Sequence, residues 1–518
     1  MTVASKKLKK RTWAAIGAAA AVGGVAVRDL IQKKNAVLRN YPVLGHARYQ
    51  LEKIRPMIQQ YFIERDWDGR PFDKTTRDLV NARADGKKAE EAFGTLAEVN
   101  EVGFEWMVHS MNPLEPPQTP PRVEIGGPDC SKPYSMSLLN ISAMSFGSLS
   151  GNAIKALNKG ARMGNFAHDT GEGGFTPYHQ QGGDLILEIG TGYFGVRDQD
   201  GKFDPGRFRD VSSNEQIKAV EIKLSQGAKP GLGGVLPGPK VTKEIAEIRG
   251  IPEGVKCVSP PGHSAFKTPT ELIEFIAKTR ELSGGKPTGY KLCVTSVEDV
   301  LAMCKAMIEV GTAPDFIVVD GAEGGTGAAP VEFETHMGMP LTQGLMIVHN
   351  ALVGAGLRDK VKIGASGKIA EGNAIVKRLI QGADFTNSAR GMMLALGCIQ
   401  SLRCAEGTCP VGVATQNPRL ERGLDVDVKA ERVYNFHQAT VAQAVKIMAS
   451  MGVTRVEDLS PAMLRRNVSP DNNDSFARLF TWLEPGELLS DSPRMWKEHW
   501  ENASSSRYGL GNAKTARA

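Results

Sequence analysis

Residues 289–325 read GYKLCVTSVEDVLAMCKAMIEVGTAPDFIVVDGAEGG, and this stretch contains one complete unit of the predicted fold. The apolar runs at 289–296 and 315–325 are typical of buried strands. Between them, residues 296–311 have helical spacing and end at a glycine, as helices often do. Two strands joined through a helix predict a parallel β-α-β unit.

The same alternation of strand and helix continues on both sides of this unit. Roughly eight such units over about 300 residues predict a closed (β/α)8 TIM barrel, a fold that typically needs ~250 residues. A doubly wound open sheet is the alternative, because a strand count from sequence is uncertain by about one or two. The other predicted strands are SLLNISAM (137–144), YFGVR (193–197), AVEIKLS (219–225), GVKCVS (254–259), VKIGASG (361–367) and DFTNSARG (384–391), and the other helices are 152–164, 269–282 and 373–382.

The barrel is expected to lie between two helical regions. Before it, apolar side chains recur at helical spacing, at Leu51, Ile54, Ile58 and Phe62, and this face is expected to pack on something larger. A proline-rich passage, NPLEPPQTPPRVEIGGPDC, then breaks any helix and leads into the barrel. The predicted regions are 1–28 (basic and apolar), 29–115 (helical), 116–425 (barrel with a cysteine loop) and 426–518 (helical, with a tail).

Composition excludes some classes of protein. The net charge of +6 is small for 518 residues, and the basic residues are scattered among carboxylates, so no nucleic-acid partner is expected. Seven cysteines are too few, and odd in number, for a disulfide framework. The 57 glycines gather at 171–195, 227–238 and 321–327, where the backbone is expected to approach a ligand.

The N-terminus combines the basic run KKLKKR with the apolar run TWAAIGAAAAVGGVAV at residues 12–27. This apolar run is shorter than the ~20 residues that cross a bilayer comfortably. We expect a membrane-associated helix that attaches a cytoplasmic catalytic body to the inner face of the membrane. A signal peptide has the same charge-then-apolar form, and a plain soluble tail is a further alternative.

Three cysteines, Cys398, Cys404 and Cys409, follow the last predicted strand in the pattern C-x5-C-x4-C. Thiolates are the preferred ligands of iron-sulfur clusters, and a loop punctuated by glycine and proline can wrap a metal centre. The alternative is a zinc site, but a four-thiolate zinc site lacks its fourth cysteine nearby and His437 is distant in sequence. The triad therefore predicts a cluster.

Two late strands end in small residues, in DGAEGGTG (320–327) and GASGKIAEGN (364–373). Such loops expose backbone N–H groups to an anion, and barrel enzymes often bind phosphate after their late strands. The alternative is a simple tight turn. A lysine in an apolar strand, Lys291, needs an anionic partner if it points into the barrel, and a reduced flavin would supply one. Lys223 poses the same question, and a solvated strand edge is the alternative for both.

The segment CIQSLRCAEGTCPVGVATQNP resembles the cluster loop of the glutamate synthase family, which holds a 3Fe-4S cluster beside FMN. Five further segments, spread with it over residues 120–425, match that family in the same order: SAMSFGSLS (142–150), TGEGG (170–174), EIKLSQGAKPGLGGVLPG (221–238), SPPGH (259–263) and DGAEGGTGAAP (320–330). The resemblance implies an FMN-binding barrel with this cluster and assigns roles to particular residues.

By this resemblance, Glu172 is catalytic and handles a proton or holds ammonia, with a turn cap as the alternative, and Lys223 is the second catalytic residue. The resemblance places 2-oxoglutarate over the flavin, and a dicarboxylate needs cations and hydrogen-bond donors at both ends. On its own, Arg249 would be interpreted as a surface residue. The implied substrate residues are Met144, Ser145, Gly147, Ser148, Gln226, Lys229 and Arg249, and the implied FMN residues are Lys291, Asp320, Gly324, Gly325, Thr326, Gly327, Gly364, Ser366, Gly367 and Gly391.

The resemblance implies an oxidoreductase acting on CH–NH2 donors that reductively aminates 2-oxoglutarate, through 2-iminoglutarate, to glutamate. No segment matches a glutaminase domain, and no G-x-G-x-x-G follows a strand. Electrons are therefore expected from an external donor, a ferredoxin or a reductase subunit, and nitrogen from solution or an amidotransferase partner. A homo-oligomer is expected. The alternatives are a membrane-associated flavin and iron-sulfur redox module, and an N-methylglutamate synthase-type enzyme that uses an alkylamine.

Overall fold

The computed structural model describes residues 3–90, 92–490 and 493–509. The end of the predicted tail, residues 510–518, lies outside the described residues, as do residues 1–2 of the predicted N-terminal segment. The chain divides into two compact units, residues 1–75 and 76–518.

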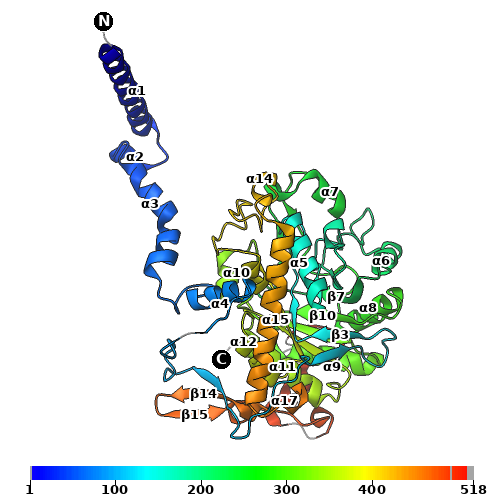
Figure 1. Cartoon of the computed structure of the whole chain (residues 1–518). Helices are drawn as coiled ribbons and strands as arrows, with labels where there is room; N and C mark the ends of the chain where they lie inside the picture. The colour runs from blue at the N-terminus through cyan, green and yellow to red at the C-terminus, as the bar shows by residue number, and fades with distance from the viewer. Residues whose placement is uncertain (1–2, 91, 491–492, 510–518) are drawn as a thin grey trace, which may run out of the picture. The chain divides into compact units, whose positions relative to one another are not determined.

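The second unit is built around eight parallel strands that close into a barrel (Figure 1). Closure is complete because β13 pairs with β4, and β10 pairs with both β7 and β11. The prediction of a (β/α)8 barrel is confirmed, and the open sheet is excluded. The barrel strands are β4 (Leu139–Ile141), β5 (His168–Asp169), β6 (Leu185–Ile189), β7 (Ile217–Lys223), β10 (Thr288–Leu292), β11 (Phe316–Asp320), β12 (Lys362–Ser366) and β13 (Phe385–Ser388).

Helices cover the outside of the barrel. Local signals define their ends: α9 begins where Ser296 accepts the Asp299 N–H (3.1 Å) and ends at Gly311, whose φ is +79°. The long helix α15 can lie close to α5 because Gly160 has no side chain; a Cβ there would come within 2.9 Å of the Ala430 carbonyl oxygen. The helices between and after the barrel strands are α5 (Gly151–Gly164), α6 (Pro205–Ser212), α7 (Lys243–Arg249), α8 (Pro269–Leu282), α9 (Val297–Val310), α10 (Val331–His336), α11 (Leu341–Gly354), α12 (Gly372–Ile380), α13 (Arg390–Ala395), α14 (Pro418–Glu421) and α15 (Val426–Ser450), with short turns η2 (Pro177–His179) and η3 (Gly238–Lys240).

Side chains alternate between the two faces of the barrel strands. In β6, Leu187 and Ile189 belong to the apolar core shared with the surrounding helices, and in β7 Val220 and Ile222 do the same. The residues between them are charged and buried, and Glu188 lies beside Glu221 in the strand register. These charged side chains therefore point into the barrel.

Two barrel strands differ from the sequence prediction. The structure uses β5 and β6 in place of the predicted strands YFGVR (193–197) and GVKCVS (254–259). The first of these is a turn, with Tyr193 at φ +46°, and its apolar residues are buried as part of a loop. The second contains β9 (Cys257–Val258), which pairs antiparallel with β8 (Val235–Leu236) outside the barrel. Strand β5 is only two residues long, too short to give a pattern.

Strands also occur in the regions that were predicted to be helical. A three-stranded sheet joins β1 (Glu105–Met107) to β14 (Leu464–Ser469) and β15 (Asn472–Ser475). A hairpin of β2 (Arg122–Ile125) and β3 (Tyr134–Ser137) precedes the barrel. The remaining elements of this unit are α4 (Lys74–Ala84), η4 (Val456–Asp458), η5 (Pro461–Met463), α16 (Phe476–Leu479), η6 (Glu487–Leu489) and α17 (Arg494–Asn502).

The first unit contains α1 (Val3–Ile31), α2 (Ala36–Asn40), α3 (Gly45–Ile58) and the π-helical turn η1 (Gln59–Ile63). Within α1, the 22-residue stretch Lys10–Ile31 contains an 18-residue window with a mean hydropathy of 1.6, and the helix is long and apolar enough to cross a membrane, as a signal sequence would also be. This stretch is longer than the apolar run seen in the sequence. The helical face predicted to pack on something larger is exposed, with Leu51 60% and Phe62 83% accessible.

Candidate active site

Glu172 follows β5 at one end of the barrel, in a space formed by glycines. A Cβ at Gly190 or at Gly234 would lie 2.7 Å or 2.0 Å from the Glu172 side chain, so both positions must lack one. The Oε1 of Glu172 lies 3.2 Å from the Nζ of Lys223, the last residue of β7. The two predicted catalytic residues therefore form an ion pair at the carboxyl end of two barrel strands.

The charge around Glu172 is strongly positive. Burial alone would raise the pKa of this carboxyl group, but the cations of Lys223, Arg249 and Lys229 outweigh burial and lower its pKa. Glu172 is thus held as a carboxylate. Three cations surround this one anion, which leaves the site with a surplus of positive charge.

Arg249, at the end of α7, is 5% exposed and is therefore not the surface residue that its local sequence suggests. Its Nη2 donates to the Phe146 carbonyl (3.1 Å) and the Ser145 hydroxyl (3.4 Å), and Ser145 in turn donates to Ser148 (3.1 Å). Its Nε is buried without a hydrogen-bond partner among the described residues, and so can donate to a ligand. Gly147 suits this position because its φ of +99° favours glycine, and a Cβ would lie 3.3 Å from this guanidinium group.

The other predicted substrate residues lie on the loops next to this arginine. Lys229 is 2% exposed and donates to the Ala328 carbonyl (3.1 Å), and burial lowers its pKa to about 8. Gln226 is half-buried, and its main-chain carbonyl accepts the main-chain N–H of Lys229 (3.4 Å). Met144 is buried, and its carbonyl carbon would lie 3.0 Å from a Cβ at Gly171.

The glycine loops that follow β11, β12 and β13 form a cradle at the same end of the barrel. A Cβ at Gly325 would lie 2.7 Å from the Arg390 Nε, while one at Gly327 would meet nothing within 4 Å. Gly391 has no room for a Cβ, which would lie 2.5 Å from the Ser388 hydroxyl. Arg390 was missed from the sequence, although it directly precedes Gly391 in the quoted segment DFTNSARG, and it adds a cation to backbone suited to an anion.

Asp320 joins this cradle to the substrate loop, and Ser366 joins two loops of the cradle to each other. Asp320 accepts the Gly227 N–H (2.7 Å), and the Ser366 carbonyl accepts the Gly321 N–H (2.8 Å). Asn387, at the carboxyl end of β13, has a buried Oδ1 without a partner among the described residues. The remaining predicted residues of the cradle lie in the same loops: Gly324, whose N–H donates to Gly321, half-buried Thr326, and Gly367, with φ +150°.

Gly364 differs from the other predicted cofactor residues because it lies within β12. A Cβ at this position would come within 2.5 Å of the Phe385 ring. Phe385 is fully buried in the next strand, directly opposite Gly364 in the register. The structure therefore gives Gly364 a packing role inside the barrel.

Lys291 also lies inside the barrel, at 4% exposure, so it is not on a solvated strand edge. Its ammonium group contacts the carboxylates of Glu188 and Glu221. Burial would lower the pKa of Lys291, but the neighbouring carboxylates prevail and raise it well above its usual value. The anionic partner that the sequence required is thus supplied by two glutamates of the chain itself, and a flavin is not needed to explain this lysine.

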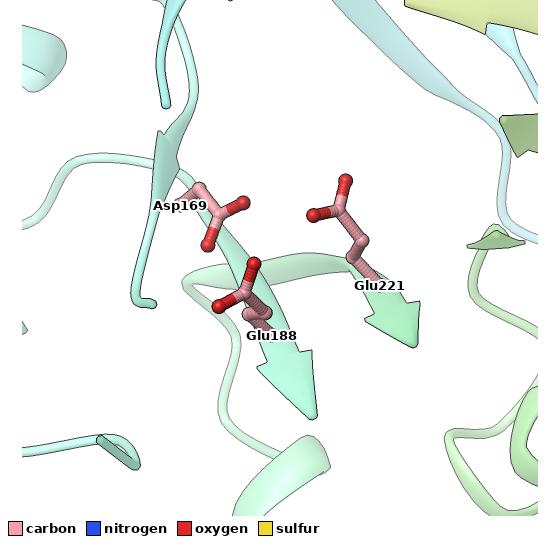
Figure 2. Close-up of side chains that lie close together, drawn as sticks. All are labelled: Asp169, Glu188 and Glu221. Atoms are coloured by element: carbon pink, nitrogen blue, oxygen red, sulfur yellow. The ribbon is translucent and has the colours of Figure 1, made fainter. Parts of the chain in front are cut away.

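Figure 2 shows the carboxylates of Asp169, Glu188 and Glu221 turned toward one another from three neighbouring strands. One oxygen atom from each of the three lies within 4.8 Å of the other two, close enough to hold a metal ion. Burial, followed by the charge of the two glutamates, raises the pKa of Asp169 well above its usual value. Because the Lys291 ammonium group already lies against Glu188 and Glu221, and the pKa of Asp169 is raised, we interpret the cluster as an internal ion network that supports the barrel.

The cysteine triad lies in the loop after α13. Burial and the neighbouring thiolates of Cys404 and Cys409 raise the pKa of Cys398 to about 11. Within the described part of the chain, the three sulfurs do not lie within 4.8 Å of one another, whereas a zinc ion with Zn–S of about 2.3 Å would hold them closer. His437 is buried and bonded through Nε2 to the Leu139 carbonyl (2.9 Å), so it does not complete a zinc site.

Hydrogen bonds join the cysteine loop to the predicted substrate loop. Gln416 donates to the carbonyls of Gly147 (3.2 Å) and Leu149 (2.7 Å), and the Ser150 hydroxyl donates to the Gly412 carbonyl (2.7 Å). A buried lysine between the loops, Lys240, was missed from the sequence because its segment, GPKV, has no pattern that distinguishes it from a surface lysine. The two sites are therefore held in contact.

Comparison with known proteins gives a consistent assignment. Residues 113–454 match the model of the conserved region in glutamate synthase. The glutamate synthase large subunit-like protein YerD of Bacillus subtilis is 37% identical over 454 residues, 80% of this chain and 86% of the relative. The archaeal-type glutamate synthase (NADPH) of Thermotoga neapolitana is 35% identical over 319 residues, 61% of this chain and 60% of the relative. This chain thus spans less than two thirds of the length of that synthase.

Among solved structures, a flavocytochrome b2 variant with sulfite bound has a TM-score of 0.44 and 12% identity, covering 93% of this chain and 97% of its own. A lactate oxidase from Pediococcus acidilactici has a TM-score of 0.42 and 14% identity, and the match covers 77% of this chain and 88% of the oxidase chain. The fold assignment rests on the closed strand order itself. The sequence relatives confirm the prediction of an oxidoreductase of the glutamate synthase type. The match of the family model over residues 113–454, together with these relatives, means that the chain belongs to the glutamate synthase family.

Proposed function

We propose that this chain reductively aminates 2-oxoglutarate to glutamate, with FMN as its bound cofactor and with electrons that arrive from an external donor through a 3Fe-4S cluster. The observation that carries the proposal is the charge of the site. Lys223, Lys229 and Arg249 are buried around the carboxylate of Glu172 and outnumber it, which leaves the site with a surplus of positive charges. A dicarboxylate such as 2-oxoglutarate would neutralise them.

Arg249 is the strongest candidate to hold one carboxylate of the substrate. Its buried Nε has no partner among the described residues, and the hydroxyls of Ser145 and Ser148 lie next to it in one hydrogen-bonded row. Lys229 supplies a second cation from another loop. Separate cations suit a substrate with a carboxylate at each end.

Amination exchanges the C2 oxygen of the substrate, which leaves as water, for nitrogen, and the imine then needs a hydride at C2 and a proton. FMN supplies the hydride when it is bound. Glu172 remains ionised among the three cations, so its carboxylate can hold the incoming ammonia and take a proton from the nitrogen once it has added to C2. Lys223, paired with Glu172 at 3.2 Å, orients this carboxylate.

The residues present suit both cofactors. Gly324, Gly325 and Arg390 would hold the FMN phosphate, because they combine open backbone with a cation. Cys398, Cys404 and Cys409 would hold the cluster, which transfers single electrons. The hydrogen bonds of Gln416 place the cysteine loop directly against the substrate loop, which supports electron transfer between the two sites.

The proposal is tested by anaerobic turnover of the purified chain with dithionite or reduced ferredoxin, over a panel of 2-oxo acids and amines. We expect FMN and iron in the protein and glutamate from 2-oxoglutarate plus ammonia. A product formed only with methylamine would indicate an N-methylglutamate synthase instead. Purified protein without FMN would refute the proposal. Reduced flavin that no combination of oxo acid and amine reoxidises would also refute it, and would favour the alternative of a flavin and iron-sulfur redox module.

A matched pair of variants tests the role of Glu172. We expect Glu172→Gln to reduce glutamate formation by about 100-fold or more with FMN still bound, as loss of an acid–base group does. Glu247→Gln makes the same chemical change at an exposed position of α7 and should leave turnover unchanged. Unchanged turnover in Glu172→Gln would remove this residue from the mechanism.

We further propose that α1 attaches the chain to the inner face of the membrane, with the barrel in the cytoplasm. Its apolar stretch, Lys10–Ile31, is long enough to span, and Asp29 within it accepts the Val43 N–H (2.9 Å) and pairs with His46 (2.9 Å). These contacts join α1 to the residues that follow it, which favours a retained helix over a cleaved signal peptide. Carbonate-resistant membrane fractionation of the full chain, lost on deletion of residues 1–31, would support this; recovery of a chain cleaved after α1 would contradict it.

A further inference from the structure

Lys240 lies between the cysteine loop and the substrate loop at 4% exposure. It ends the short turn η3, and its ammonium group donates to the carbonyl oxygens of Ser148 (2.8 Å) and Cys404 (3.3 Å). Its aliphatic stem passes across the cysteine loop, where a Cβ at Gly407 would lie 3.3 Å from the Lys240 Cγ. The cation is thus held between a carbonyl of the substrate loop and a carbonyl of the cysteine loop.

This buried ammonium group has no carboxylate partner within 4 Å among the described residues. The charged groups that act on it are the thiols of Cys404 and Cys409, which would favour its charge when ionised, and the guanidinium group of Arg249, which opposes it. A buried cation that has only carbonyl oxygens as partners is costly. Its environment therefore lacks one negative charge, and the nearest groups able to provide it are the cysteine thiolates.

We propose that Lys240 is the counter-ion of the cluster held by Cys398, Cys404 and Cys409, and that its positive charge raises the reduction potential of that cluster. The inference rests on the proposed function, because it requires the cluster. Reduction adds one electron, and therefore one negative charge, to the cluster. A fixed cation at this position stabilises the reduced form relative to the oxidised form, as charge and hydrogen bonding near a cluster generally do.

Three variants of the full chain separate charge from shape. Lys240→Met keeps most of the stem and removes the charge, Lys240→Arg keeps the charge, and Lys243→Met removes a charge from an exposed position three residues away. For each, we would measure iron and FMN content and follow the cluster by electron paramagnetic resonance during an anaerobic redox titration. The midpoint potential is informative because packing alone, without charge, would not shift it systematically.

We expect Lys240→Met to shift the equilibrium toward the oxidised cluster by at least tenfold, a fall in potential of about 59 mV for one electron. Lys240→Arg and Lys243→Met should match the wild type. An unchanged potential in iron-loaded Lys240→Met would overturn this inference and leave the proposed function intact. If Lys240→Met loses its iron and Lys240→Arg retains it, the requirement for charge is supported; loss from both, with FMN retained, would overturn it. Wild-type protein with FMN but no iron would refute the proposed cluster and this inference together.

Discussion

Replacement of Lys291 by methionine tests the ion network inside the barrel. The change removes the ammonium group that contacts Glu188 and Glu221 and leaves an aliphatic side chain of similar length. Solvent cannot reach these carboxylates, because both side chains are almost fully buried. The barrel can therefore remain closed only if an additional proton neutralises one of them.

The cost of that proton sets the expected loss of stability. The ordinary pKa of a glutamate is 4.5. Keeping one glutamate protonated costs about 1.36 kcal/mol for each pH unit above that pKa. The free energy of unfolding should fall by about 3.4 kcal/mol at pH 7 and by about 1.4 kcal/mol at pH 5.5, in line with the roughly 3–5 kcal/mol for a broken buried pair. A carboxyl whose pKa is raised in the folded state favours folding at low pH, and this contribution is lost as the pH rises, so the deficit must grow with pH.

Thermal unfolding of wild type and variant at both pH values measures this deficit. For a unit of roughly 440 residues, an unfolding entropy of about 2.1 cal/mol/K per residue converts 3.4 kcal/mol into a fall in Tm of about 4 °C. Adding Glu188→Gln to Lys291→Met removes a carboxylate that has lost its ammonium partner. The double variant should therefore show a loss of stability that no longer depends on pH. A Tm within 1 °C of the wild type at pH 7, with no dependence on pH, would refute this account of the network.

Three further outcomes follow from the site. Because the pKa of Lys229 is about 8, the KM for 2-oxoglutarate should be constant below that pH and rise above it as the lysine loses its charge; a KM that falls above pH 8 would contradict this. Gly325→Ala would place a Cβ 2.7 Å from the Arg390 Nε, so FMN should dissociate at least tenfold more readily, measured by fluorescence of released flavin, and unaltered affinity would exclude this loop. Cys404→Ser should lose iron but keep the Tm of the barrel within about 2 °C; retention of the full iron content would remove Cys404 as a ligand.

Local pattern was sufficient for most of the barrel. The helices α8, α9 and α12 were expected within one or two residues of their observed ends, because capping residues and apolar spacing act locally. Strands β5 and β6 were missed. The short β5 carries His168 and Asp169, which are polar yet fully buried, and no local pattern distinguishes such residues from a loop. The segment that begins at Tyr193 was wrongly predicted as a strand, because a buried loop can be as apolar as a strand.

The structure brings several of the predicted site residues together and adds partners that the sequence did not indicate. Glu172 and Lys223 are paired, and Arg249 lies beside the serine loop, although its helix alone suggested a surface position. Arg390 and Lys240 were not identified. Their functional interest comes from what lies next to them in space, and a single basic residue in sequence carries no such information.

The sequence by itself determined the alternation of strand and helix, the family motifs and the spacing of Cys398, Cys404 and Cys409, because each is a property of neighbouring residues. Only the tertiary structure decided which charges meet. Lys291 contacts Glu188 across 103 positions of the chain, and Lys240 reaches the Cys404 carbonyl across 164. Such pairs depend on barrel closure and strand register, which bring distant side chains into a space from which water is excluded, and there an unpaired charge is too costly to remain.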